Sequence, residues 1–558
     1  IFGVRSGSPF IYTIPATGKR PMKFEAENLP EGLKLDPDTG HISGKIIKNG
    51  EYVVTLKAIN ELGKSVREFR IVCGDNICLT PAMGWSSWYV WARDVSEQHL
   101  LDTAKAMVES GLINHGWTYI NIDDGWQGKR GGKFNAIQPN EKFTDMQSLC
   151  DYVHSLGLRI GIYSTPWITS YARYIGGSSN YEDGQWSSDE SSMQGPPGGP
   201  NNSSLAENIW STLAFKLKLD DANLDKAIPI LQKAWDERKR LTEEADWGFQ
   251  AMADGMAKLK PEIYKEIKSI LTEEQFKALS ELENSQEQPE SNSPYGKFSF
   301  VKNDVNQWAE WGIDYFKYDW NPIDIPHSTE MGDALKACGR DIVYTLSNQA
   351  SFEHASDWAR IANSWRTTFD LSDNWQTISR IGFYQDKWAT YAGPGHWNDP
   401  DMIMIGKVGT GRGLHPSGLT PDEQYAHFSL WCLLSAPLIL GCDLTDLDDF
   451  TLNLITNDEV IDIDQDALGK QATRVMKSGD HEVWAKDLED GSKAVGLFNL
   501  GDLAGKVTFI WSDINVNGKQ IVRDLWRQKD IGTFDGNFEA EVPSHGVVLV
   551  KISPVKIK

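Results

Sequence analysis

Two aspartates carry the clearest chemical signal in this sequence of 558 residues. Asp319 closes the aromatic run that starts at Tyr315, and Asp370 closes the run that starts at Ser364. Each is expected where a buried strand meets its loop. Glycoside cleavage requires two carboxyl groups, one that attacks the sugar or activates water and one that protonates the leaving oxygen. The pair therefore indicates sugar-cleaving chemistry.

Cations near these carboxyl groups give them different expected roles. Lys317 lies two residues before Asp319, so both side chains point to the same side of a strand. A nearby ammonium keeps a carboxylate ionised, which suits a nucleophile. Arg366 lies four residues before Asp370, and an acid/base carboxyl instead needs a pKa raised by burial or by a neighbouring negative charge. Two alternatives stay open, because Asp370 could cap a helix and Asp373 competes for the acid role.

From about residue 79, short apolar runs alternate with helical patterns. The expected strands are Pro81–Trp85, Thr118–Asp124, Arg159–Ser164, Tyr315–Trp320, Ile342–Ser347, Ser364–Asp370, His396–Ile405 and Pro437–Leu444. The expected helices include Ser96–Glu109, Met146–Leu156, Val305–Trp311, Met331–Cys338 and Asp422–Leu434. Eight such units predict an α/β fold, a (β/α)8 TIM barrel, with a doubly wound sheet as the alternative. Polar residues at nearly every strand end favour the barrel.

The active site of such a barrel lies at the carboxyl ends of its strands. Those ends offer, in chain order, Trp85, Trp88, Asp123, Asp124, Tyr163, Lys317, Asp319, Ser347, Asn348, Arg366, Asp370, Trp397, Asp399, Asp401 and Met402. Carboxylates bind sugar hydroxyls through charge-assisted hydrogen bonds, and Trp and Tyr supply stacking faces. Asp399 and Asp401 could instead cap a turn around Pro400. His396 has no partner histidine at ligand spacing, so it is not expected to bind a metal.

Three further regions flank or interrupt the barrel pattern. Residues 1–77 read as an all-β module with strands at Pro9–Ile14, Glu51–Ala58 and Val66–Cys73, and residues 78–468 as the barrel. Residues 182–294 form an insertion after the third strand, with a loop at Gly195–Ser204 and helices near Leu224–Leu241, Pro261–Leu271 and Glu273–Leu282. Thr272 and Gln275 predict a capping box for the last of these helices. Residues 469–558 read as an antiparallel β domain. We expect the insertion to form a rim over the active face, the alternative being a helical excursion without a role.

Composition limits the partners. The net charge of −23 disfavours nucleic acid and anionic membranes, and no segment is apolar for long enough to span a membrane. Cys73 and Cys78 could close a small disulfide loop, whereas Cys432 and Cys442 lie in apolar runs typical of buried thiols. The first residue is Ile1 rather than Met, for which a removed signal peptide and a trimmed chain are both explanations.

Six ordered motifs resemble glycoside hydrolase family 27, which contains the α-galactosidases and α-N-acetylgalactosaminidases. They are Leu79–Trp88, Tyr119–Trp126, Gly161–Ser164, Tyr315–Asp319, Trp365–Asp370 and Gly393–Met402. The resemblance spans about residues 79–558 without the insertion. Separately, the segment Leu29–Gly44 resembles immunoglobulin-like modules that are appended to secreted bacterial enzymes. It implies a spacer or docking domain rather than chemistry. A secreted or periplasmic bacterial protein is expected if a signal peptide has been removed before Ile1.

The family resemblance implies roles position by position. Asp319 matches the nucleophile and Asp370 the acid/base, while Asp123 and Asp124 match the pair that holds the galactose 4- and 6-hydroxyls. Further matches to sugar-binding positions are Trp88, Tyr163, Lys317, Arg366 and Asp401. The implied reaction is retaining hydrolysis of terminal α-linked galactose through a covalent glycosyl-enzyme, with no metal and no organic cofactor.

The sequence departs from the family pattern at two places. Trp320, Asn321 and Pro322 follow the nucleophile where many members carry a cysteine. Ser347 and Asn348 stand where eukaryotic α-galactosidases have Glu and Trp, in the loop that reads the sugar 2-position. An α-N-acetylgalactosaminide or a β-L-arabinopyranoside is therefore the alternative substrate, although the Asp123–Asp124 pair favours a sugar with a 6-hydroxyl. A non-catalytic carbohydrate-binding protein is the alternative from another class.

Overall fold

A computed structural model describes residues 1–185, 219–244, 249–284, 294–409 and 413–555, together with residues 209, 213 and 217. The chain divides into two compact units, one formed by Ile1–Gly195 with Tyr295–Lys558 and the other by Pro196–Pro294. In the described ranges, no helix is long and apolar enough to cross a membrane. The predicted loop Gly195–Ser204 falls outside the described residues.

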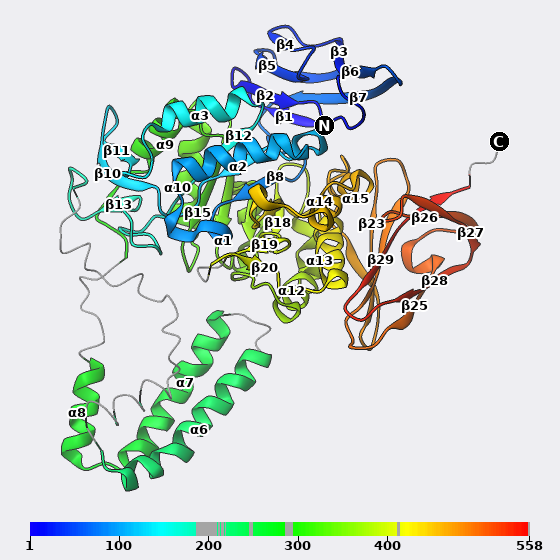
Figure 1. Cartoon of the computed structure of the whole chain (residues 1–558). Helices are drawn as coiled ribbons and strands as arrows, with labels where there is room; N and C mark the ends of the chain where they lie inside the picture. Colours follow the sequence, from blue (N-terminus) through cyan, green and yellow to red (C-terminus); the bar gives the residue numbers. More distant parts are fainter. Residues whose placement is uncertain are drawn as a thin grey trace. The chain divides into compact units, whose positions relative to one another are not determined.

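Eight parallel strands form the central sheet of the first unit (Figure 1). In chain order they are β8 (Met83–Ser86), β9 (Tyr119–Asn121), β12 (Arg159–Ser164), β15 (Tyr315–Asp319), β16 (Val343–Ser347), β17 (Ser364–Arg366), β18 (Trp397–Asp399) and β21 (Leu438–Leu440). Chain neighbours pair in register from β8 to β18, and β21 pairs with β8. A parallel bridge between Ile403 and Leu440 then joins the segment after β18 to β21. This order confirms the predicted barrel and excludes the doubly wound alternative.

Helices follow the strands, and local capping chemistry explains where they begin. They include α2 (Glu97–Glu109), α3 (Met146–Ser155), α9 (Val301–Trp311), α10 (Ile325–Ala337), α12 (Trp375–Gly382) and α13 (Pro421–Leu434). The side chains of Ser96, Asp145 and Asp324 accept backbone N–H groups in the first turns of α2, α3 and α10. The predicted helices are confirmed, but α9 and α10 begin several residues earlier than their apolar periodicity indicated.

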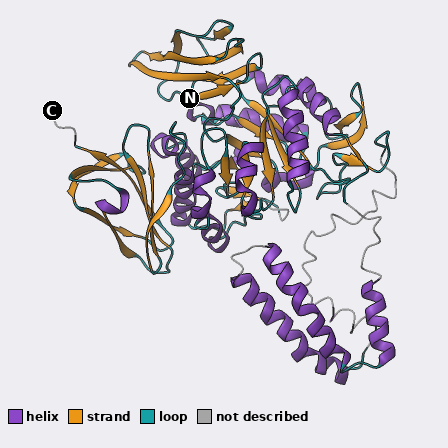
Figure 2. Cartoon of the chain, turned by 180° about the vertical axis from the view of Figure 1, so that it is seen from behind, coloured by secondary structure: helices purple, strands orange, loops and turns teal. Residues whose placement is uncertain are grey.

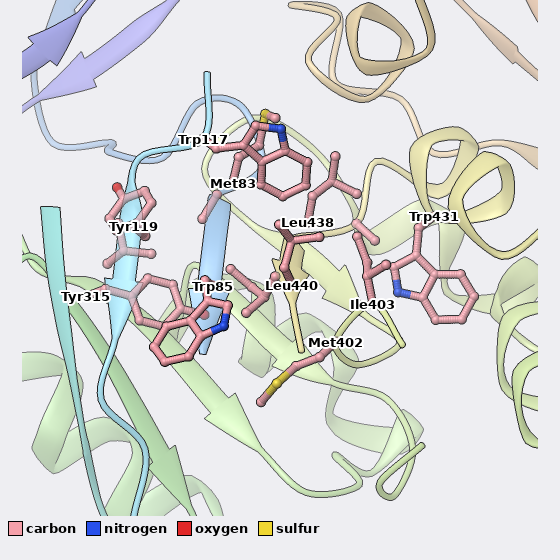
Figure 3. Packing of buried hydrophobic residues seen from close by; sticks show 14 of the residues in the cluster. Met83, Trp85, Trp117, Tyr119, Tyr315, Met402, Ile403, Trp431, Leu438 and Leu440 are labelled. Carbon is pink, nitrogen blue, oxygen red and sulfur yellow. The ribbon is translucent and has the colours of Figure 1, made fainter. Parts of the chain in front are cut away.

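The interior of the barrel unit is one aromatic-rich cluster. Figure 3 shows Trp85, Tyr119 and Tyr315 from barrel strands packed near Leu438 and Leu440 of β21. Trp85, Trp117 and Trp431 are fully buried, and each indole N–H donates to a backbone carbonyl. Many of the 22 tryptophans therefore pack the protein interior and are not available to stack on a sugar ring.

The N-terminal module contains two antiparallel-rich sheets with their own apolar cluster. One sheet has the order β1 (Phe2–Val4), β7 (Gly63–Cys73), β6 (Gly50–Asn60) and β3 (Lys23–Glu27), and the other has β2 (Pro9–Thr13), β5 (His41–Lys45) and β4 (Leu33–Leu35). Specific bonds join it to the barrel. Arg5 Nε lies 2.7 Å from Asp341 Oδ1, and the Thr13 hydroxyl donates to the Gly157 carbonyl at 2.8 Å.

The C-terminal part is antiparallel, as predicted (Figure 2). Its six-stranded sheet has the order β22 (Thr473–Ser478), β23 (His481–Asp487), β24 (Lys493–Asn499), β29 (Val547–Pro554), β26 (Lys519–Asp524) and β27 (Lys529–Asp535). A second pair consists of β25 (Gly505–Ile510) and β28 (Asn537–Val542). The two sheets share a separate apolar cluster that includes Val483, Phe509 and Phe538.

The second unit contains three described helices, α6 (Asp221–Glu244), α7 (Phe249–Lys268) and α8 (Glu273–Asn284). They follow β12 and precede β15 in the chain, where the insertion was predicted. The predicted capping box is confirmed, because Gln275 N donates to Thr272 Oγ1 at 3.2 Å and Thr272 N donates to Gln275 Oε1 at 3.0 Å. The expectation that this unit forms a rim over the barrel stays a prediction.

All six cysteines are free thiols. The disulfide considered for Cys73 and Cys78 is therefore wrong. Cys73 ends β7 with its Sγ 3.9 Å from the Ile46 carbonyl oxygen, while Cys78 Sγ lies 3.3 Å from its own near neighbour, the Thr80 carbonyl oxygen. Cys432 and Cys442 are fully buried, as expected.

Candidate active site

Asp319 is the last residue of β15 and is buried, with 7% of its surface exposed. Asn348 Nδ2 donates to its Oδ1 at 2.5 Å, and Lys317 Nζ lies 4.0 Å from its Oδ2. Burial raises the pKa of Asp319 to about 7, which the Lys317 charge opposes and the charges of Asp370 and Asp123 reinforce. Lys317 favours the ionised form, as expected, but burial outweighs its charge. Lys317 lies closer to Asp123, at 2.9 Å, and so divides its charge between two carboxylates.

Asp370 lies four residues beyond β17, in a loop rather than in the strand predicted for it. Its side chain is 58% exposed, so the burial expected of an acid/base carboxyl is absent. Arg366 Nη2 donates to its Oδ1 at 3.1 Å. The helix-cap alternative is excluded, because Asn374 caps the next helix, α12. The competing Asp373 accepts the Gly418 N–H at 2.9 Å and is held by a different loop.

Asp123 and Asp124 follow β9 and are almost completely buried. Asp123 Oδ2 accepts from Lys317 Nζ at 2.9 Å and from the Ser86 hydroxyl at 3.2 Å. Asp124 accepts from Gln127 Nε2 at 3.0 Å and from the Ala172 N–H at 2.8 Å. Burial raises the pKa of Asp124 to about 6, which these hydrogen bonds oppose. The pair is therefore held rigidly at the barrel mouth beside Lys317.

Lys317 binds the two carboxylate groups together. Burial by itself would lower the pKa of its ammonium, but the charges of Asp123 and Asp319 outweigh burial and raise that pKa above its ordinary value. Its Nζ also lies 5.6 Å from the centre of the Tyr163 ring on β12. Lys317 thus stays charged and connects three neighbouring strand ends.

A second cation group lies on the other side of the mouth. Arg366, at the end of β17, places Nη1 3.0 Å from Asp401 Oδ1 while its Nη2 contacts Asp370. Asp401 also accepts from the Tyr89 hydroxyl and from the Leu371 N–H, both at 2.8 Å. The two buried groups Arg366 and Asp401 therefore orient the loop that carries Asp370.

Two buried hydroxyls at the mouth have no hydrogen-bond partner within the described residues. They are Tyr163 Oη on β12 and Ser347 Oγ at the end of β16. Ser347 stands opposite Asp319 in the strand register. A buried hydroxyl without a partner is costly, and a substrate hydroxyl would satisfy it. Trp88, in α1 (Trp88–Trp91), is half-buried against the core and follows the Ser86–Ser87 pair that contacts Asp123.

Three residues expected at the mouth make structural contacts. Trp397 is the first residue of β18, so it lies at the opposite end of the barrel, where its indole N–H donates to the Cys78 carbonyl at 2.9 Å. Asp399 accepts the Asp401 N–H at 2.8 Å and so caps the turn around Pro400, which was the alternative role considered for it. Met402 is 7% exposed and packs in the apolar cluster that contains Trp85 (Figure 3). The expected strand ran from His396 to Ile405, whereas β18 ends at Asp399, so Trp397 lies at its amino end and Asp399 at its carboxyl end.

Sequence reasoning missed two tyrosines and two serines that hold the site. Ser86 and Ser87 both bond to Asp123, and they lie inside a motif that could have indicated them. Tyr89 supports Asp401, and Tyr171 Oη lies 3.5 Å from Asn348 Nδ2. Tyr171 comes from a loop after β12 with no regular pattern, so no sequence signal pointed to it.

In the described parts of the chain, no three His, Cys, Asp or Glu side chains are grouped so that they could hold a metal ion. His396 Nδ1 instead contacts the Tyr391 carbonyl oxygen at 2.8 Å. A parallel barrel whose mouth brings together Asp319, Asp370 and a buried aspartate pair defines a TIM-barrel glycoside hydrolase.

Comparison with known families gives the same class. A family model described as alpha galactosidase A matches residues 80–190 and 289–466, and one described as alpha galactosidase C-terminal beta sandwich domain matches residues 478–552. A third, described as “Putative Ig domain”, matches residues 2–73. The chain belongs to the α-galactosidase family of glycoside hydrolases, glycoside hydrolase family 27. The matched ranges leave out most of the second unit.

Individual relatives agree in length and fold. Alpha-galactosidase 2 of Arabidopsis thaliana is 30% identical over 85% of this chain and 90% of its own length. The alpha-galactosidase of Cyamopsis tetragonoloba is 30% identical over 87% of this chain and 89% of its own length. Among solved structures, a “putative alpha-galactosidase” from Bacteroides fragilis is 27% identical, with a TM-score of 0.73 over 100% of this chain and 96% of that one.

Proposed function

We propose that this protein is a retaining exo-α-galactosidase that releases terminal α-linked galactose from oligo- or polysaccharides. The observation that carries the proposal is that one ammonium, Lys317, joins Asp319 to Asp123, the first member of the buried aspartate pair. Asp319 can attack the anomeric carbon, and Asp123 and Asp124 can accept hydrogen bonds from sugar hydroxyls. This set of carboxyl groups suits a neutral hexose as substrate. The family relation supports the same reading.

The reaction proceeds in two steps. Asp319 attacks the anomeric carbon while the bond to the leaving oxygen breaks, and Asp370 gives its proton to that oxygen. The product is a galactosyl ester of Asp319 and a free alcohol. In the second step Asp370 takes a proton from water, the water oxygen attacks the anomeric carbon, and Asp319 leaves as a carboxylate. Two inversions retain the α configuration.

The geometry assigns different duties to the two acids. Asp319 is buried in a strand end, so its position is fixed for attack. Asp370 is exposed and lies in a loop, so it is accessible to a leaving group and to water. Attack requires the ionised form of Asp319, and its pKa of about 7 in the free enzyme means that ionisation limits the rate at acidic pH.

Sugar recognition uses the residues deeper in the mouth. Asp123 and Asp124 accept the 4- and 6-hydroxyls of galactose, and Lys317 donates beside them. Tyr163 Oη and Ser347 Oγ offer two further polar contacts to hydroxyls. This arrangement disfavours a β-L-arabinopyranoside, which has no 6-hydroxyl for the aspartate pair.

A second candidate substrate is an α-N-acetylgalactosaminide. Ser347 is small, its Oγ has no partner in the described part of the chain, and it occupies the loop that was expected to read the sugar 2-position. A short side chain there accommodates a larger group on C2 than a glutamate would. The two substrates differ only at that carbon.

A panel of nitrophenyl glycosides tests the proposal. We expect hydrolysis of the α-galactoside, weaker hydrolysis of the α-N-acetylgalactosaminide and none of the β-L-arabinopyranoside, with all activity lost in Asp319→Asn. Preference for the N-acetyl substrate would replace the first candidate by the second. Undiminished hydrolysis by Asp319→Asn would remove the assignment of the nucleophile.

We also propose a secreted or periplasmic bacterial enzyme of three parts, 1–77, 78–468 and 469–558, with the insertion at 182–294. The immunoglobulin-like module supports this, because such modules accompany secreted bacterial enzymes. Fractionation of the native host tests it: the proposal expects the protein outside the cytoplasm, and recovery from the cytosol alone would contradict it.

A further inference from the structure

The loop after β16 has an unusual backbone. Asn348 and Gln349 are consecutive residues with positive φ, +73° and +39°. Few residues other than glycine adopt this region, and asparagine is among the more tolerant. The loop is fastened to the neighbouring strand end, because Gln349 N donates to the Thr368 carbonyl at 3.2 Å and Ala350 N donates to the Arg366 carbonyl at 2.7 Å. Such strain persists where the surroundings fix it, and it often marks a functional position.

This backbone directs the Asn348 amide at Asp319. Its Nδ2 carries two hydrogens, one of which donates to Asp319 Oδ1 at 2.5 Å. Tyr171 Oη lies 3.5 Å from the same nitrogen on another side. Because both neighbours can accept, the amide is oriented with nitrogen rather than oxygen toward Asp319.

The two oxygens of Asp319 therefore have different environments. Oδ1 is occupied by Asn348, and Oδ2 faces the Lys317 ammonium at 4.0 Å, with Asp123 beyond it. A carboxylate with a hydrogen-bond donor on one oxygen cannot rotate freely about its Cβ–Cγ bond. Its second oxygen then points in a fixed direction, toward the group that would bind the sugar.

We propose that Asn348 is a positioning residue that holds Oδ1 of Asp319, so that Oδ2 is the oxygen that attacks the sugar. This rests on the proposed function, in which Asp319 is the nucleophile, and it differs from the sugar-binding role expected for Asn348. In the first step the bond from Oδ2 to the anomeric carbon forms, the bond to the leaving oxygen breaks, and Asp370 supplies the proton. Oδ1 becomes the carbonyl oxygen of the ester and still accepts from Asn348.

The proposal predicts a change in the pH profile. A hydrogen bond to the carboxylate favours the ionised form, so its loss raises the pKa of Asp319. The other titratable or charged groups that act on Asp319 or are acted on by it are Lys317, Asp123, Asp370, Arg366, Tyr163 and Tyr171. Among these groups Tyr171 contacts Asn348 directly, at 3.5 Å, so a variant of Tyr171 is needed to show that a moved profile reports the bond lost to Asp319.

The test compares Asn348→Gly with the wild-type enzyme on nitrophenyl α-galactoside. Glycine accepts the positive φ of this position, so backbone strain does not confound the result. We expect kcat/KM to fall about 10- to 100-fold, as for a lost hydrogen bond to a charged group, and the acid limb of its pH profile to move to higher pH. Asn348→Asp, which places a second carboxylate there, should move the limb further in the same direction.

Tyr171→Phe is the matched control. It removes the second neighbour of the Asn348 amide but leaves the donor to Asp319, so its acid limb should stay at the wild-type position. An unmoved limb in both Asn348 variants overturns the inference, whether or not their rates fall. An inactive Asp319→Asn in the same assay keeps the proposed function standing in that case, whereas an active Asp319→Asn removes both.

Discussion

At the scale of residues, burial and pairing compete at Asp319. The carboxyl is buried at a strand end and shares Lys317 with Asp123, so its ionised form is disfavoured until the pH approaches 7. Ionising Asp319 costs more free energy in the folded protein than in the unfolded chain, so this carboxyl group lowers the free energy of unfolding at neutral pH. The active site is thus a place where stability is given up for function.

This competition predicts the stability of Asp319→Asn. The folded pKa of about 7 lies above the ordinary 3.8, so the contribution of this one group to stability is fully present below pH 3.8 and is lost as the pH rises toward 7. Asparagine has no such loss. Thermal or urea unfolding should show little difference near pH 4 and a more stable variant at pH 8, by up to about 4 kcal/mol at about 1.4 kcal/mol per pKa unit.

The opposite trend would contradict this account of the site. If Asp319→Asn were less stable than wild type at pH 8 and equal at pH 4, the carboxylate would be a net stabiliser, and Lys317 would dominate over burial. Asp373→Asn is a suitable control, because Asp373 is held by another loop outside the mouth.

Residue types at strand ends indicated much of the site. Asp123, Lys317, Asp319 and Arg366 follow from alternation along short strands and are brought together by the structure. Trp397 was misplaced because it is the first residue of its strand and therefore lies at the amino end, away from the mouth. Tyr89 and Tyr171 could not be found, because their contacts join segments that are distant in sequence and obey no periodic pattern.

At the scale of elements, local signals predicted helices better than their starts. Helix α13 is the exception, because it begins at Pro421, one residue before its expected start. Thr420 Oγ1 accepts the Glu423 N–H at 3.3 Å and Glu423 Oε2 accepts the Thr420 N–H at 2.8 Å. This capping box begins a helix whose residues are buried on nearly every side. An all-round buried helix gives no amphipathic period, so its caps carry the information.

The cap makes a measurable contribution. Thr420→Ala should lower the free energy of unfolding by about 1 kcal/mol, because it removes the acceptor for the Glu423 N–H. Thr420→Ser keeps the hydroxyl and should lie close to wild type in the same urea titration. Equal losses in the two variants would show that the methyl group, not the hydroxyl, matters.

At the scale of the whole molecule, the N-terminal module is joined to the base of the barrel, away from the strand ends that carry the acids. Gly157, between α3 and β12, has a φ of +77°, and an added Cβ would lie 2.5 Å from Thr13 Oγ1 and collide with His41 as well. Thr13 and His41 belong to β2 and β5 of the module. The close approach therefore requires glycine.

Gly157→Ala should loosen the module without altering the active site. We expect faster proteolysis or hydrogen exchange in residues 1–73 and an unchanged kcat/KM on a small aryl galactoside. Gly339→Ala is the matched control, since Gly339 has a φ of +78° with no neighbouring atom within 4 Å of the added Cβ. Equal loosening in the two variants would attribute the effect to backbone strain rather than to the module contact.

The alternation of strands and helices predicted the whole barrel, and turn-rich composition predicted both β regions. The sequence did not show whether the eight strands close into a barrel. The bridge between Ile403 and Leu440 shows that they do, because it joins the segment after β18 to β21. The pairing of module and barrel was beyond sequence reasoning, because single contacts such as Arg5 with Asp341 leave no pattern in the chain.

The most direct test of the central claim is to trap the glycosyl-enzyme. A fluorinated α-galactosyl fluoride, which slows the second step, is incubated with the enzyme, and the proteolytic peptides are weighed by mass spectrometry. We predict one added fluorogalactosyl group on the peptide that contains Asp319, at that residue, and none in Asp319→Asn. Attachment at another residue, or turnover of galactosides with inversion and no attached sugar, would contradict the account.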